Sequence, residues 1–315
     1  MEYPYKISVI IPIFGVEKFI ERCARSLFEQ TLEEIEYIFV DDCTKDNSMT
    51  ILNAVLEKYP QKKDHVIILK HEHNKGLPQA RKTGVAVARG EYIAHCDSDD
   101  WVEEGMYERM YATAKREDAD IVCCGYYKSD GNAKTPVNVY PTKTLLTGPV
   151  WNKLVHNELY RHEEIEYPVA NKAEDGALMV QLSYFAKNVA YINDSLYYYF
   201  QNPESMCRVM TEEALLKRVE QEHKNVELMI NFLRRVNALE KYKSDIVRWK
   251  KTCRDNLLPY YNEKKFRRLW RNTYPEVNRQ YLLDSSNSCH ARINFLMDYL
   301  GLRNIWIGIK KIWYK

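Results

Sequence analysis

Three carboxylates crowd into the four residues Asp97–Ser98–Asp99–Asp100, directly after a short apolar run. Divalent cations such as Mg²⁺ and Mn²⁺ take oxygen ligands, often one or two carboxylates together with substrate phosphates. The cluster therefore fits a metal site that joins the protein to a diphosphate. A solvated acidic turn, with Asp100 near the start of the next helix, is the alternative, and the spacing alone favours that turn.

Two further acidic pairs carry side chains suited to a polar substrate. Asp41–Asp42 follow an apolar run, and their carboxylates could accept hydrogen bonds from a base or a ribose. The alternative is a turn ahead of the next helix. Glu174–Asp175 precede the apolar stretch 177–180. One of them could be a general base that removes a proton from an acceptor hydroxyl, and the alternative is a helix N-terminus with favourable acids.

Other candidates carry weaker signals. Arg81 could bind a diphosphate or be a surface charge. His71 and His73 have no further Cys or His at ligand spacing, which argues against a metal there. Gly-x-Gly-x-x-Gly and Walker patterns are absent, so dinucleotide oxidoreductases and P-loop ATPases are disfavoured. The Gly-x-Ser-x-Gly pattern is absent as well.

The elements that must position these residues alternate along the first hundred residues. Short apolar runs predict buried strands, and apolar residues at helical spacing predict the helices between them. The expected strands are 8–14, 37–40, 66–69 and 92–96, and the expected helices are 16–28, 49–59 and 77–88. This order predicts βαβ units and an α/β fold with a mostly parallel sheet. Ligands bind beyond the carboxyl ends of such strands, where three clusters lie: Pro12–Phe14, Asp41–Asp42 and Asp97–Asp100.

Regularity weakens after a further expected strand at 120–125. Glycines and prolines predict loops or short strands over 126–150. Short helices are expected at Trp151–Leu159 and Ala177–Phe185, and Tyr197–Phe200 is a short aromatic-rich segment. Helical spacing returns from about residue 211. We therefore expect a catalytic domain over 1–208 and an α-helical C-terminal region over 209–315.

The charge is unevenly distributed along the chain. The formal net charge is only +2, but residues 251–315 hold 13 Lys+Arg against 5 Asp+Glu. That segment also contains aromatic and aliphatic residues, among them Ile293, Leu296, Trp306 and Trp313. A basic amphipathic segment can lie on an anionic membrane surface, or it can pack on the catalytic domain. Nothing in the charge pattern indicates a nucleic-acid partner.

The cysteines and the start of the chain predict a cytoplasmic protein, with peripheral contact at the inner face of the cell membrane as an extension. None of the eight cysteines lies in a Cys-x-x-Cys spacing, which fits reduced and mostly buried thiols. Met1 leads straight into the strand near Ile7, so no signal peptide is expected. No uncharged apolar run approaches the roughly 20 residues that span a bilayer.

Taken in order, these clusters resemble family 2 glycosyltransferases of the GT-A (Rossmann-like) fold. The similarity covers roughly residues 5–208. It rests on SVIIPIF at 8–14, SLFEQT at 26–31, FVDDCTKD at 39–46, GLPQARKTGVAVARGEYIAHCDSDDW at 76–101, VWNKLV at 150–155, EDGALMV at 174–180 and YYYFQNPESM at 197–206.

The resemblance implies a role for each matching position. Pro12 and Phe14 match the segment around the nucleobase, Asp42 matches the uracil-binding carboxylate with Asp41 beside it, and Arg81 matches a donor-side arginine. Asp99 matches the direct metal ligand of the D-x-D motif, with Asp97 on the ribose or on a metal-bound water. Asp175 matches the catalytic base supported by Glu174, and Trp151 and Lys153 match an element of the donor and acceptor cleft.

The implied activity is that of an inverting, metal-dependent glycosyltransferase. The resemblance implies Mn²⁺ or Mg²⁺, a UDP-sugar donor, and a glycan or lipid-linked acceptor. The chain departs from the family's usual Tyr-Asn at Phe14–Gly15, from Gly-Ser at Cys43–Thr44, and from Asn at Lys82. A catalytically inactive nucleotide-sugar-binding scaffold is the alternative. A nucleotidyltransferase is less consistent, because Gly15–Lys18 is no glycine-rich basic loop.

Overall fold

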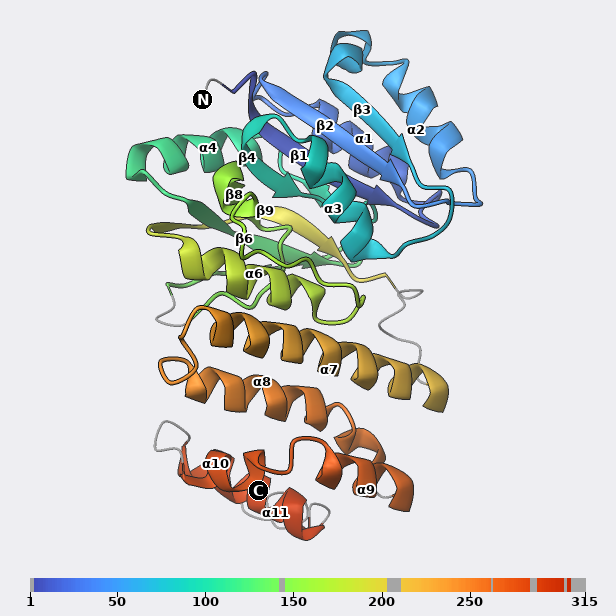
Figure 1. Ribbon diagram of the computed structural model, residues 1–315. Helices are drawn as coiled ribbons and strands as arrows, with labels where there is room; N and C mark the ends of the chain where they lie inside the picture. Colours follow the sequence, from blue (N-terminus) through green and yellow to red (C-terminus); the bar gives the residue numbers. More distant parts are fainter. Residues whose placement is uncertain are drawn as a thin grey trace. The chain divides into compact units, whose positions relative to one another are not determined.

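The computed structural model describes residues 3–141, 145–202, 211–261, 263–283, 288–302 and 305–306 (Figure 1). The chain forms two compact units, Met1–Val209 and Met210–Lys315. The boundary predicted at residue 208 falls outside the described residues.

The first unit begins with four parallel strands in the order β3-β2-β1-β4. They are β1 (Tyr5–Ile13), β2 (Ile35–Asp41), β3 (Val66–Lys70) and β4 (Gly90–His95), joined through α1 (Ile20–Phe28), α2 (Ser48–Leu56), the 3₁₀ helix η1 (Pro60–His65) and α3 (Leu77–Val87). Every residue of β2 is buried, as expected for a parallel strand covered on both faces. The α/β fold with helices on both faces of a sheet is thereby confirmed.

Beyond β4 the sheet is mixed. Strand β8 (Lys153–His156) lies antiparallel between β4 and β6 (Ile121–Ser129). Strand β9 (Val189–Phe200) runs parallel to β6 and pairs antiparallel with the short β5 (Trp101–Val102). Strand β7 (Lys134–Val137) pairs with β6 alone, and the helices of this half are α4 (Met106–Glu117), α5 (Asn157–Tyr160) and α6 (Glu174–Phe185).

The helix predicted over Trp151–Leu159 is wrong. Residues 153–156 form β8, and only Asn157–Tyr160 are helical. The physical reason is the vacancy between β4 and β6, where Leu154 pairs with Ala94 on one side and with Val122 on the other. Pairing on both edges outweighs the weak local preference of a four-residue segment.

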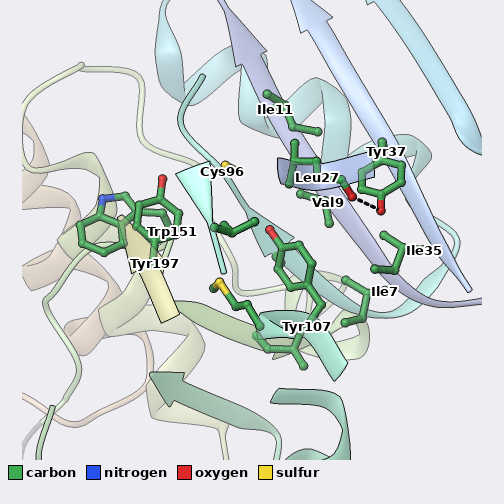
Figure 2. Close-up of a cluster of buried hydrophobic side chains, with 14 of the residues drawn as sticks. Ile7, Val9, Ile11, Leu27, Ile35, Tyr37, Cys96, Tyr107, Trp151 and Tyr197 are labelled. Carbon is green, nitrogen blue, oxygen red and sulfur yellow. Dashed lines mark hydrogen bonds between the residues drawn. The ribbon is translucent and has the colours of Figure 1, made fainter. Parts of the chain in front are cut away.

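Alternate residues of β1 face two separate cores. Val9 and Ile11 belong to one core, and Ile10 belongs to the other. Figure 2 shows part of the first core, in which Tyr37 donates a 2.6 Å hydrogen bond to the carbonyl of Leu27 on α1. Helices α1 and α4 cover this face, whereas α3 and α6 contribute to the second core.

The second unit is helical, as predicted. Its elements are α7 (Glu212–Arg235), α8 (Lys243–Asp255), the 3₁₀ helix η3 (Leu258–Tyr260), α9 (Lys264–Asn272), α10 (Val277–Leu283) and α11 (Cys289–Leu300). Thr211 caps α7 by accepting a hydrogen bond from the backbone N–H of Ala214. A core around Trp270, Phe266 and Phe295 holds these helices together. Within the described ranges, no helix is long and apolar enough to cross a membrane.

Candidate active site

The predicted site residues gather where β1, β2 and β4 end. The Ser98 hydroxyl donates a 2.7 Å hydrogen bond to the carbonyl of Pro12, which joins the acidic turn after β4 to the end of β1. The backbone N–H of Asp42 donates to the carbonyl of Ile13, joining β2 to the same place. Parallel strands therefore bring segments from three parts of the sequence to one edge of the sheet.

Arg81 on α3 connects the acids. Helix α3 packs closely on β1 because Gly84 has no side chain, and a Cβ there would lie 2.5 Å from a methyl group of Ile10. Arg81 is only 3% exposed. Its Nη2 donates a 2.7 Å hydrogen bond to Asp97 Oδ1, and its Nη1 donates to Asp175 Oδ1. One guanidinium thus joins the acid after β4 to the acid at the start of α6.

Three carboxylates face this single cation, since Glu174 Oε1 also lies 3.6 Å from Arg81 Nη1. Burial, together with the charge of Asp175, raises the pKa of Glu174 to about 8. A protonated Glu174 at neutral pH lowers the excess negative charge of the cluster. Asp175 keeps both oxygens engaged, because its Oδ2 accepts a 3.2 Å hydrogen bond from the backbone N–H of Val150.

Asp97, Asp99 and Asp100 have different surroundings in the acidic turn. Tyr197 Oη accepts a hydrogen bond from the backbone N–H of Asp97 and donates one of 2.7 Å to Asp100 Oδ2. Asp100 Oδ1 accepts from the backbone N–H of Phe200. Asp100 is thus fully used in tying the turn to β9, a function that the sequence did not indicate. Asp99 is half-buried, and burial with the charge of Asp97 raises its pKa to about 6.

The donor set fits a hard divalent ion bound jointly with a substrate. Across the described part of the chain, no group of three or more His, Cys, Asp or Glu side chains converges as a metal cage. Mg²⁺ and Mn²⁺ need no such cage when phosphates and waters complete their coordination. Asp99 offers a half-buried carboxylate beside the negative charge of Asp97, and a cation there would favour its ionised form.

Asp41 and Asp42 differ in their partners. The Asp42 carboxylate accepts 2.8 Å hydrogen bonds from the backbone N–H groups of Lys75 and Gly76, and its Oδ1 lies 2.7 Å from His71 Nδ1. It therefore orders the loop that leads into α3. Asp41 Oδ1 accepts from the backbone of Thr44, while its Oδ2 lies 4.0 Å from the Lys70 ammonium.

The remaining predicted residues split into one exposed ring and a buried group. Phe14, just past the end of β1, is 51% exposed, whereas Pro12 is buried. Trp151 is buried and stacks on Tyr197 with ring centroids 4.4 Å apart (Figure 2). Lys153 is buried as well, and its ammonium donates to the Asn152 side chain at 2.7 Å. Trp151 belongs to the first core, and Lys153 is buried on β8.

The family follows from comparison with known proteins. The model described as Glycosyl transferase family 2 matches residues 8–172. The chain belongs to this family. This family 2 glycosyltransferase is 33% identical over 236 residues to the uncharacterized glycosyltransferase EpsJ of Bacillus subtilis strain 168, and the match covers 69% of the chain and 67% of EpsJ.

Two solved structures share its fold. Residues 1–349 of S. aureus TarS, in complex with UDP-GlcNAc, match with a TM-score of 0.63 at 18% identity, covering 96% of this chain and 92% of that one. The mannosyltransferase PcManGT of Pyrobaculum calidifontis, in complex with GDP-Man and Mn²⁺, matches with a TM-score of 0.55 at 14% identity, covering 99% and 88%. The predicted GT-A fold is confirmed.

Proposed function

We propose that this glycosyltransferase moves a hexosyl or N-acetylhexosaminyl group from a UDP-sugar to a hydroxyl of a glycan or lipid-linked acceptor, with inversion and with Mn²⁺ or Mg²⁺. The observation that carries the proposal is Arg81, whose two terminal nitrogens bind Asp97 and Asp175. It brings a donor-side acid and an acceptor-side acid to one buried cation. The UDP-GlcNAc bound to TarS supports a UDP-sugar by analogy of fold.

In the proposed reaction, Asp175 accepts the proton of the acceptor hydroxyl. The acceptor oxygen then attacks the anomeric carbon while the nucleoside diphosphate departs from the opposite face, so one displacement inverts the configuration. Arg81 orients Asp175, and a protonated Glu174 lowers the negative charge beside it. A divalent ion held by Asp99, with Asp97 beside it, would supply a Lewis acid for the leaving diphosphate.

The donor base is assigned to the edge formed by β1 and β2. Phe14 presents an exposed ring for stacking on the base, and Pro12 fixes the backbone beneath it. Of the two aspartates, Asp41 is the better hydrogen-bond acceptor for the base, because among the described residues its Oδ2 has only the Lys70 ammonium, 4.0 Å away, as a partner. Asp42 supports the site indirectly by ordering the loop before α3.

Two substitutions test the assignment. Asp99→Ala should abolish Mn²⁺-dependent hydrolysis of UDP-sugars, and Asp175→Asn should lower sugar transfer by roughly a hundredfold or more, the usual contribution of a general base. Asp64→Asn, at an exposed position in η1, is the matched control. Near-parental rates in both site variants, with unchanged circular dichroism, would sink the proposal.

The cellular place proposed for the enzyme is the cytoplasmic face of the membrane. Ile293, Leu296 and Leu300 are exposed and recur at helical spacing on α11, within the basic C-terminal segment. Leu296→Glu with Leu300→Glu should reduce pelleting with vesicles containing anionic lipid, while Val169→Glu, in the catalytic unit, should not. Equal pelleting of the parent, the double variant and Val169→Glu would refute the membrane proposal.

A further inference from the structure

Arg22 on α1 reaches the acidic turn from the side opposite Arg81's helix. Its Nη2 donates a 3.0 Å hydrogen bond to the backbone carbonyl of Asp99. The guanidinium carbon lies 3.6 Å from the ring centroid of Trp101 and 4.8 Å from that of Phe200. A planar cation can stack on an aromatic face and donate in its own plane at once, which a lysine ammonium cannot do.

Arg22 lies between a packed helix and a pair of stacked aromatic rings. Helix α1 is anchored by its buried face, which includes Cys23 and Leu27. Trp101 stacks on Tyr198 of β9 at 4.8 Å with an interplanar angle of 9°. These contacts fix the position of the guanidinium, which in turn holds the Asp99 carbonyl in the acidic turn.

Each residue of the turn has a contact with one of three elements, β1, β9 or α1. Ser98 is held by β1, and Asp97 and Asp100 are held by Tyr197 of β9. Asp99 is held by Arg22 through its carbonyl, and its carboxylate accepts a hydrogen bond from the Asn202 side chain. The contact on the carbonyl therefore holds the backbone from which the Asp99 carboxylate extends.

We propose that Arg22 is a positioning residue that holds the backbone carrying the Asp99 carboxylate and thereby raises the affinity for a divalent ion together with a nucleoside diphosphate. The inference rests on the proposed metal role of Asp99 and adds a residue that touches neither metal nor substrate. Charge-assisted hydrogen bonds to a backbone carbonyl are among the stronger ones, so the loss of this one should be measurable.

Titration of the full-length protein with UDP, with and without MnCl₂, tests the inference. Arg22→Ala should weaken Mn²⁺-dependent UDP binding about tenfold and leave metal-free UDP binding unchanged. Arg22→Lys should be intermediate, because it keeps a charged donor and loses the planar stack. Arg25→Ala, one turn along α1 in an exposed pair with Glu21, is the matched control and should bind as the parent does.

Asp99→Ala distinguishes the proposed metal role of Asp99 from the proposed positioning role of Arg22. If Asp99→Ala abolishes the Mn²⁺ effect while Arg22→Ala does not change it, the positioning role is refuted and the metal assignment stands. If Asp99→Ala leaves the Mn²⁺ effect intact, the proposed metal role of Asp99 fails. Equal weakening of UDP binding by Arg22→Ala with and without Mn²⁺ also refutes the positioning role, because general damage to the fold would produce it.

Discussion

Replacing Arg81 with methionine should destabilise the catalytic unit through its carboxylates. Methionine keeps much of the buried stem but removes the cation between Asp97 and Asp175, with Glu174 3.6 Å away. Removing one partner of a buried ion pair costs about 3–5 kcal/mol, because the remaining charge has no compensation. We expect a cost in this range at about pH 8.5, measured as the free energy of unfolding in urea.

The loss of unfolding free energy in Arg81→Met should grow as the pH rises. Burial already raises the pKa values of Asp97 and Glu174 in the parent, and the charge of Arg81 opposes that rise. Without Arg81 both pKa values rise further, so the folded state binds protons more tightly. Stability is then lost as pH rises, and the destabilisation should be smaller at about pH 5.5 than at about pH 8.5. At the higher pH, adding Asp175→Asn to Arg81→Met should recover part of the loss by removing one charge.

Arg116→Met is the control for removing an arginine, because Arg116 forms an exposed pair with Glu117. Exposed pairs contribute about 0–1 kcal/mol, so this variant should unfold almost as the parent does. The reasoning is refuted if Arg81→Met costs less than about 1 kcal/mol, or if its cost is the same at both pH values.

Three further predictions follow from single contacts. Glu174→Gln should stabilise the protein at about pH 8.5 but not below about pH 4.5, because the raised pKa of Glu174, about 8, makes the parent lose stability as pH rises between these values; urea unfolding at both ends of the range checks this. Gly90→Ala should lower the yield of folded protein in the soluble fraction, since its Cβ would lie 2.4 Å from a backbone nitrogen of β1. Tyr197→Phe should cost about 1–3 kcal/mol in urea unfolding, because Asp97 and Asp100 each lose a buried partner; a cost near zero would contradict that account.

The parallel half of the sheet was predictable because its strands are short apolar runs and its helices are amphipathic. The antiparallel half was not. Lys153–His156 form a strand only because β4 and β6 leave a place between them, which a local window cannot show. The sequence predicted only the aromatic end of strand β9, because Asn193–Asp194 interrupt the apolar pattern. The register between β9 and β6 shifts at the same place.

The site was predictable as a set of acids and an arginine, but not as a set of contacts. The pattern put Asp41 and Asp42 in one category, whereas the structure uses Asp42 to hold backbone N–H groups and leaves Asp41 with a distant ammonium. Arg22 carried no signal in the sequence, because its role depends on Trp101 lying beside α1. Partners of this kind are fixed by the tertiary fold rather than by spacing.

The insertion of β8 between β4 and β6 has a consequence for the chain during its synthesis. When β4 leaves the ribosome, the strand that will cover its free edge still lies about 60 residues ahead, which corresponds to about 3–12 s of elongation. An unpaired apolar edge is a template for association with other chains. The nascent protein therefore has a defined interval of vulnerability, which ends when His156 and its neighbours arrive to close the sheet.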